Sequence, residues 1–298
     1  MKIQHHQVIW LNLANPQPNE LIFLQEELKI SSSVIKELLA FNKRPKIEEC
    51  DNYLFLVLHF PVFHQKTSQT LPTELDFIIT PEQIITIYQN SNPSLEKFFE
   101  EVKNDSDLQA NYFRSPAYLL FCILDKLIDS CLPMLDHIHE KIEIIEKNVF
   151  EGKEREMLKE IAIVKRDIID FRRTIKPQRS ALELLAKKVN RFFKQDFDFI
   201  TQEVIGSEVR VWNILENHKE MIEAIEKTNE GLLSYQINRV MHTLTFFSII
   251  LFSLTFIASF FSMRIFSITS RWGFGVILAI MIVDVIIITL LFKRKRWM

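Results

Sequence analysis

The stretch VMHTLTFFSIILFSLTFIASFFSM, from Val240 to Met263, decides the architecture of this chain. After His242 it contains no ionisable side chain. An α-helix rises about 1.5 Å per residue, so about 20 apolar residues cross a hydrocarbon core about 30 Å thick. The stretch therefore predicts a membrane-spanning helix.

A second apolar run, Trp272 to Phe292, follows after a short connection, and the next residues are Lys293, Arg294, Lys295 and Arg296. Basic residues beside a span favour the cytoplasmic side, and two spans return the chain to its starting side. We therefore expect a multi-pass protein of the cell (inner) membrane with both termini in the cytoplasm. Arg264 and Arg271, in the connection, weaken this charge bias without reversing it.

The region before Val240 is polar enough to form a water-soluble body, and its first residues lack the apolar core of a signal peptide. Residues 1–115 combine apolar strand-like runs with helical segments, which predicts a mixed α/β domain. Prolines and serines punctuate these runs, as expected at turns and helix starts. The expected strands are 8–13, 53–60, 75–80 and 84–88, and the expected helices are 34–39 and 93–102.

From Pro116 the apolar residues follow a helical period, and Pro177 should break or kink this helical region. A last helix is expected to begin near Gly206, because an apolar stripe starts at Val209 and enters the first span without a break. So long a helix needs partners along its length, and copies of the same chain are the expected ones. The expected parts are 1–115 (cytoplasmic α/β domain), 116–205 (helical region), 206–263 (stalk helix and first span), 264–271 (external loop), 272–292 (second span) and 293–298 (basic tail).

Composition excludes some functions and leaves others open. The net charge of −2 offers no argument for nucleic-acid binding, and Cys50, Cys122 and Cys131 lack metal-ligand spacing. No Gly-rich phosphate loop and no nucleophile–base arrangement is present, so no catalytic residue and no enzyme activity is expected. We expect no cofactor either, apart from a divalent cation such as magnesium as a transported or regulatory ion.

Several segments, in this order, resemble the CorA family of magnesium and cobalt transporters, and the similarity covers nearly the whole chain. They are RPKIEE at 44–49, the helical segments 116–150 and 158–177, INRVMHTLT at 237–245 and the basic-tryptophan ending at 293–297. The resemblance implies a homopentameric, funnel-shaped membrane protein whose first spans line the pore. Lys293, Arg294, Lys295 and Arg296 would then form a basic collar near the cytoplasmic pore mouth.

The chain departs from this family at the outer end of the first span. Where the family has Gly-Met-Asn, this sequence has Ser262, Met263 and Arg264. An arginine has no acceptor atom and stays protonated, so a ring of Arg264 side chains at the mouth would repel a cation. The acidic loop typical of the family is also absent, because residues 267–271 read SITSR.

Polar and aromatic residues recur at spacings of three and four along the first span, which indicates either a pore stripe or helix-packing contacts. Met241 and Leu244 extend the stripe inward and would form an apolar gate. The predicted pore-lining residues are Met241, Leu244, Ser248, Phe252, Thr255, Ser259 and Ser262, with Ser262, Met263 and Arg264 at the mouth.

Other charged residues have more than one interpretation. Asp284 lies midway along the second span, where a carboxylate is costly. We expect it to pair locally, with Ser253 as its candidate partner, and the alternative is a direct role in transport. The resemblance places a regulatory cation site on the stalk, where Ile214–His218 stands in for the family's D-x-x-D-H; Glu216 and Glu220 are its candidate ligands here.

Three functions remain open on this reading. The first is passive flux of divalent cations through a pentameric pore, the second is a channel with anion or weakly selective permeation caused by Arg264, and the third is a non-conducting scaffold or regulator.

Overall fold

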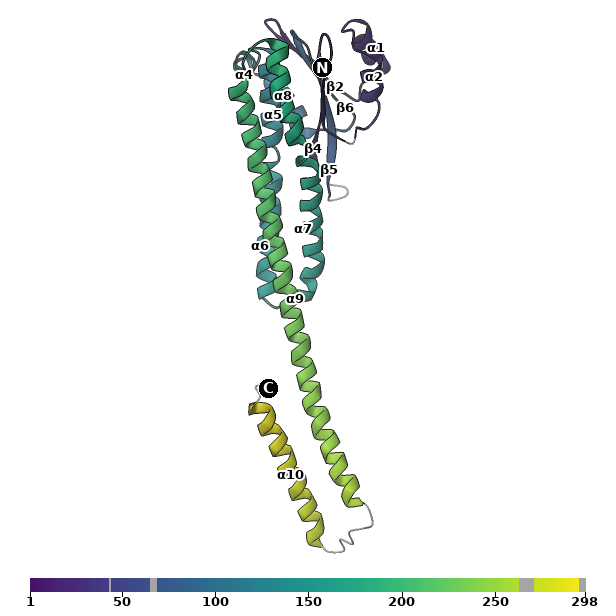
Figure 1. The fold of residues 1–298 in the computed structure, drawn as a ribbon, viewed down its shortest axis with the longest axis vertical. Helices are drawn as coiled ribbons and strands as arrows, with labels where there is room; N and C mark the ends of the chain where they lie inside the picture. The colour runs from purple at the N-terminus through teal and green to yellow at the C-terminus, as the bar shows by residue number, and fades with distance from the viewer. Residues whose placement is uncertain (43, 65–68, 263–270, 295–298) are drawn as a thin grey trace. The chain divides into compact units, whose positions relative to one another are not determined.

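The computed structural model describes residues 1–42, 44–64, 69–262 and 271–294, and the chain divides into two compact units, 1–225 and 226–298. The first unit contains a sheet and most of the helices (Figure 1). The second contains the membrane half of α9 together with α10. In chain order the described elements are β1 (Lys2–His5), β2 (Val8–Ala14), α1 (Pro18–Glu26), α2 (Ser32–Leu38), β3 (Lys46–Glu49), β4 (Leu54–His64), β5 (Gln69–Ile79), β6 (Gln83–Tyr88), α3 (Pro93–Asn104), α4 (Ser106–Tyr112), α5 (Pro116–Asp129), α6 (Leu132–Phe150), α7 (Glu154–Ile175), α8 (Gln178–Phe193), α9 (Asp198–Ser262) and α10 (Arg271–Arg294).

The six strands form one sheet in the order β1-β2-β6-β5-β4-β3. Only β2 and β6 pair in parallel, with Trp10 opposite Ile84, and the other pairs are antiparallel. The expected strands 75–80 and 84–88 correspond to β5 and β6, which pair as an antiparallel hairpin. Because side chains alternate along each strand, the sheet presents two apolar faces.

Helices cover both faces of the sheet and make a three-layer α/β/α arrangement. On one face, α1 and α2 contribute Leu24 and Val34 to a core with Phe55, Val57 and Ile78. The other face carries α7 and α8 over β3–β5 and α5 beside β6 (Figure 1). The mixed α/β domain expected from the apolar runs is therefore present.

Strand β4 is longer than expected, because Pro61 does not end it. The strand continues to His64, and Pro61 lies opposite Pro72 of β5. At this position β3 no longer pairs with β4, and β6 no longer pairs with β5. Proline lacks an N–H, but here it removes no hydrogen bond to a third strand.

The helical region follows the expected break but differs at its last start. Helix α7 ends at Ile175 and α8 begins at Gln178, as Pro177 predicts. Helix α9 begins at Asp198 and not near Gly206. Asp196 accepts a hydrogen bond from the Asp198 N–H, and acidic residues in the first turn suit the positive end of a helix. The residues that start α9 therefore precede the apolar stripe from which the start was predicted.

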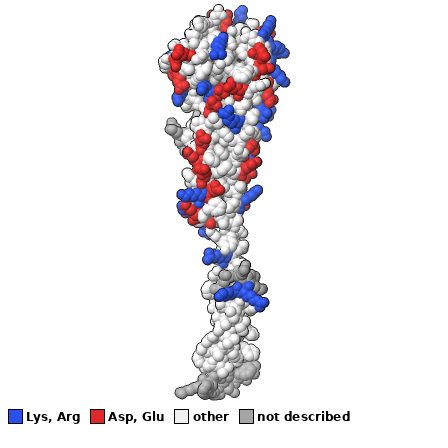
Figure 2. Space-filling view, turned by 90° about the vertical axis from the view of Figure 1, so that its left-hand side faces the viewer, with Lys and Arg blue, Asp and Glu red and all other residues white. Residues whose placement is uncertain are grey.

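Two described helices are long and apolar enough to cross a membrane: α9, whose C-terminal part lies in the second unit, and residues 274–294 of α10. On the face shown in Figure 2, these spans carry almost no charged side chains over most of their length. Both predicted spans therefore form helices.

Candidate functional site

Within the second unit, one face of α9 packs against α10. Phe246 of α9 and Ile288 and Phe292 of α10 are buried together, with Ile250 packed against them. The rings of Phe246 and Phe292 meet with their centroids 5.2 Å apart. These contacts fix which side of α9 faces α10.

The predicted pore-lining residues lie on the opposite side of α9. At about 100° per residue, Ser248, Thr255 and Ser259 point about 140° to 180° away from Ile250. Phe252 is 76% exposed and Leu244 is 61% exposed. Met241, Thr255, Ser259 and Ser262 are also exposed, and Ser248 is half-buried. The set therefore lies on the side of α9 away from α10, and all its members except Ser248 are exposed in the single chain.

The hydroxyl groups on this face have a chemical consequence. The Thr255 hydroxyl donates to the backbone oxygen of Leu251, at 2.7 Å. Its proton is thus used inside the helix, while the oxygen keeps its acceptor capacity toward the exposed side. Acceptor oxygens suit a cation or the outward-pointing hydrogens of its hydration water.

The two ends of the hairpin are only partly described. Ser262 is the last residue of α9, and Met263 and Arg264 lie outside the described residues. Lys293 and Arg294 end α10 and are exposed, whereas Lys295 and Arg296 lie outside the described residues. Basic side chains in the last turn also favour the negative end of the helix.

Asp284 does not pair with Ser253, contrary to expectation. The Ser253 hydroxyl donates to its own helix at the Ile250 oxygen, at 3.0 Å. The Oδ2 atom of Asp284 is buried and has no hydrogen-bond partner among the described residues. The Ser253 hydroxyl bonds locally and not to Asp284, because a serine in a helix readily donates to a backbone oxygen of the preceding turn.

This arrangement predicts that Asp284→Leu stabilises the isolated hairpin, because an unpartnered carboxylate in a span costs about 3 kcal/mol. Thermal unfolding of the detergent-solubilised protein should show a higher midpoint for Asp284→Leu than for the native chain. A lower midpoint would mean that Asp284 finds its partner on another copy of the chain.

The two stalk carboxylates are placed differently from each other. Glu216 is half-buried and accepts a bond from Arg172 of α7, at 2.5 Å, while Glu220 is exposed. Arg172 also lies over the ring of Trp212. No group of three His, Cys, Asp or Glu that could hold a metal occurs in the part of the chain that the structure describes. Glu216 would have to leave Arg172 to bind a cation, and its regulatory role stays a prediction.

One contact that sequence reasoning missed joins α6 to α9. His218 of α9 is buried and stacks on His139 of α6, with ring centroids 5.4 Å apart. Its Nδ1 atom has no partner among the described residues. Burial lowers the pKa of His218, the neighbouring His139 lowers it further, and Asp136 opposes them. No local pattern marks this pair, which comes from helices far apart in the sequence.

The lowered pKa of His218 predicts acid sensitivity. The folded state binds fewer protons at this site than the unfolded state, so its stabilisation is complete above pH 6.5 and is lost as the pH falls below that value. His218→Phe, which keeps the ring, should reduce the drop in melting temperature between about pH 7.5 and about pH 5.5. His137→Phe, at an exposed position of α6, is the control. Equal drops in the native chain and His218→Phe would contradict the assignment.

Comparisons with known proteins add an independent line of evidence. The model of a family described as "CorA-like Mg2+ transporter protein" matches residues 5–294. The cobalt/magnesium transport protein CorA of Thermotoga maritima is 24% identical over 293 residues, which cover 97% of this chain and 83% of that protein. The zinc transport protein ZntB of Yersinia pestis is 20% identical over 98% of this chain and 88% of that protein.

A solved structure shows the same fold. The complete CorA magnesium transporter of Methanocaldococcus jannaschii superposes with a TM-score of 0.82 at 19% identity, covering 100% of this chain and 94% of that chain. The expected fold is therefore confirmed: an N-terminal α/β region, a long helix and two C-terminal apolar helices.

Proposed function

Since this chain belongs to the family of CorA-like Mg2+ transporter proteins, which are membrane transporters and not enzymes, we propose that it conducts divalent metal cations passively across a membrane. In this proposal five copies assemble around a central pore lined by α9, and α10 lies outside it. Relatives named for magnesium, cobalt and zinc transport point to a small divalent cation as the transported ion.

The observation that carries the proposal is that the hydroxyl-bearing stripe of α9 lies on the side of the helix away from α10. One face is occupied by α10 through Phe246 and Ile250. The other is exposed in the single chain and bears Thr255, Ser259 and Ser262. Serine and threonine oxygens that face lipid gain no further hydrogen bonds there, whereas the same oxygens can accept bonds from water in a pore between copies.

The orientation follows from charge. Lys293 and Arg294 at the end of α10 favour the cytoplasmic side of a cell membrane, and the α/β unit precedes two spans and would lie on that side too. Five basic tails would then surround the cytoplasmic mouth, where they would repel cations electrostatically unless anions or acidic groups screen them.

The decisive experiment combines assembly and flux. Purified protein should have the mass of a pentamer in detergent, and proteoliposomes that contain it should take up Mg2+ and Co2+ down their gradients. A stable monomer, or an intact pentamer that moves no cation, would remove this function. Chloride current through the same pentamer would favour the second candidate, a channel whose permeation is altered by Arg264.

A single-residue test addresses the pore face. Thr255→Val removes the acceptor oxygen while nearly keeping the shape, so uptake of Mg2+ should fall several-fold. Thr289→Val is the matched control, because the Thr289 hydroxyl bonds within α10 to the Val285 oxygen in the same way as Thr255 bonds within α9. Equal uptake by the two variants would contradict a pore role for Thr255.

A further inference from the structure

A small, largely enclosed cavity of about 110 Å³ lies in the first unit, at the C-terminal end of α2. Apolar side chains and backbone from the end of α2 form one wall, and β5 and the end of β6 form the other. Two of its lining side chains, Glu74 and Asp76, are carboxylates. They lie two residues apart on β5 and therefore point to the same face of the sheet.

The two carboxylates have unequal partners. Glu74 accepts bonds from the backbone N–H of Asn42, at 2.7 Å, and from Asn42 Nδ2, at 2.6 Å. Asp76 is only 4% exposed, and its Oδ1 atom has no hydrogen-bond partner among the described residues. A buried carboxylate oxygen without a partner is rare in folded proteins, because its desolvation is not repaid.

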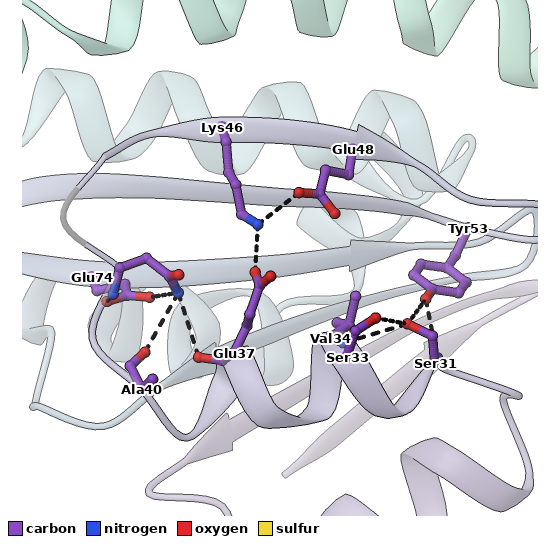
Figure 3. A network of polar contacts seen from close by, with 10 residues as sticks. Ser31, Ser33, Val34, Glu37, Ala40, Lys46, Glu48, Tyr53 and Glu74 are labelled. Carbon is purple, nitrogen blue, oxygen red and sulfur yellow. Dashed lines mark hydrogen bonds and ion pairs between the residues drawn. The ribbon is translucent and has the colours of Figure 1, made fainter.

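Lys46, a described cation whose charge acts on Asp76, does not neutralise it. Lys46 lies close enough to influence it, yet its Nζ atom pairs with Glu37 and, at 2.7 Å, with Glu48 (Figure 3). One positive charge is therefore shared between two other carboxylates. Glu74 and Asp76 both line the cavity, and the charge of Glu74 acts on Asp76.

We propose that this cavity binds one divalent metal cation between the carboxylates of Glu74 and Asp76. A charge of +2 would compensate both carboxylates at once and would supply the partner that Asp76 Oδ1 lacks. The site lies in the sheet domain and not on α9, so it is separate from the proposed conduction path.

The donor set defines the chemical class of the cation. The charged donors are oxygen atoms, and Gln89, which also lines the cavity, uses its Nε2 to bond the Leu38 oxygen, leaving its side-chain oxygen free to accept. His59 does not line the cavity, and its Nε2 lies 2.6 Å from the Asn42 oxygen. Hard cations such as Mg2+ and Mn2+ prefer oxygen ligands, and Mg2+ is commonly held by one or two carboxylates plus water. The cavity has room for a cation with part of its hydration shell.

The electrostatics of Asp76 agree with this geometry. Burial raises the pKa of Asp76 to about 8, and the neighbouring charges of Glu74 and Glu37 act in the same direction, against Lys46. A neighbouring carboxylate disfavours ionisation of Asp76, and a cation would favour it. A metal ion would hold both in the charged form.

The test counts bound metal on the full-length protein in detergent. Mn2+ titration followed by electron paramagnetic resonance should show one fewer bound ion per chain in Asp76→Asn than in the native protein, and Mg2+ should compete for that ion. Asp51→Asn, at an exposed position before β4, is the matched control and should keep the native count. An unchanged count in a folded Asp76→Asn protein would overturn the site and leave the pair bridged by a proton.

A second measurement covers the case in which Asp76→Asn does not fold. Crystals of the native protein grown with Mn2+ should show an anomalous peak between Glu74 and Asp76, and its absence would overturn the proposal. Cation uptake by proteoliposomes reports on the pore separately, so failure of this site and failure of the proposed function remain distinguishable.

Discussion

Replacing Arg264 by asparagine and Ser262 by glycine in one chain is expected to raise divalent-cation flux about tenfold or more. Five arginines at a pore mouth would raise the local potential. Two unit charges about 8 Å apart repel by roughly 2 kcal/mol at an effective dielectric constant near 20, and a divalent ion doubles each contribution. Each ~1.4 kcal/mol corresponds to a factor of ten in rate, so partial screening by solvent still leaves a large effect.

The measurement is Mg2+ uptake by proteoliposomes at low and high ionic strength. The gain over the native chain should shrink as salt rises, because salt screens the arginine charge. Arg239→Asn, which changes an exposed arginine before the first span, tests whether any loss of charge on α9 has the same effect. Native and double-variant uptake that are equal at low salt would show that the Arg264 side chains turn away from the mouth, and the electrostatic barrier would have to be abandoned.

Trp10→Ala is expected to destabilise the first unit by about 3–5 kcal/mol, the usual cost of truncating a large buried aromatic residue. Trp10 is fully buried and packs against Phe99 with ring centroids 4.9 Å apart. Its Nε1 donates to Thr86 Oγ1, at 3.1 Å, and Thr86 donates in turn to Asn12. The substitution removes both a large apolar contact and a donor in a buried polar chain.

Far-UV circular dichroism during chemical denaturation measures this change without relying on tryptophan fluorescence. Phe150→Ala is the control, because Phe150 ends α6 and is 69% exposed. If the two variants unfolded at the same denaturant concentration, Trp10 would not be the centre of this core.

The order of elements was predictable from local pattern. A single uncharged run of more than 20 residues can form all its backbone hydrogen bonds in lipid only as a helix. The run from Val240 to Met263 therefore predicts a span. Ser31 caps α2, and Pro177 separates α7 from α8, as their positions in the sequence predict. Such signals depend on residues within one or two turns of each other.

Element ends were less predictable where two local signals compete. Pro61 is a strong stop signal, yet β4 continues because the neighbouring strand has already ended. The apolar stripe from Val209 suggested a later start for α9 than the acidic turn at Asp196 and Asp198 produces. In both cases the outcome depends on pairing or capping that a periodicity of apolar residues does not contain.

The sequence alone determined the class of protein: two spans and an α/β body before them. Only the tertiary structure decided which charged groups meet. Arg172 donates a hydrogen bond to Glu216, 44 positions away in the sequence. The Ser253 hydroxyl bonds to its own helix and not to Asp284. Asp76 and Glu74 line a cavity beside the end of α2. The periodicity of apolar residues predicts which face of an element is buried. Any apolar neighbour can cover that face, because the hydrophobic effect is non-directional. A polar partner requires a specific atom at about 3 Å, and that atom comes from segments that only folding brings together.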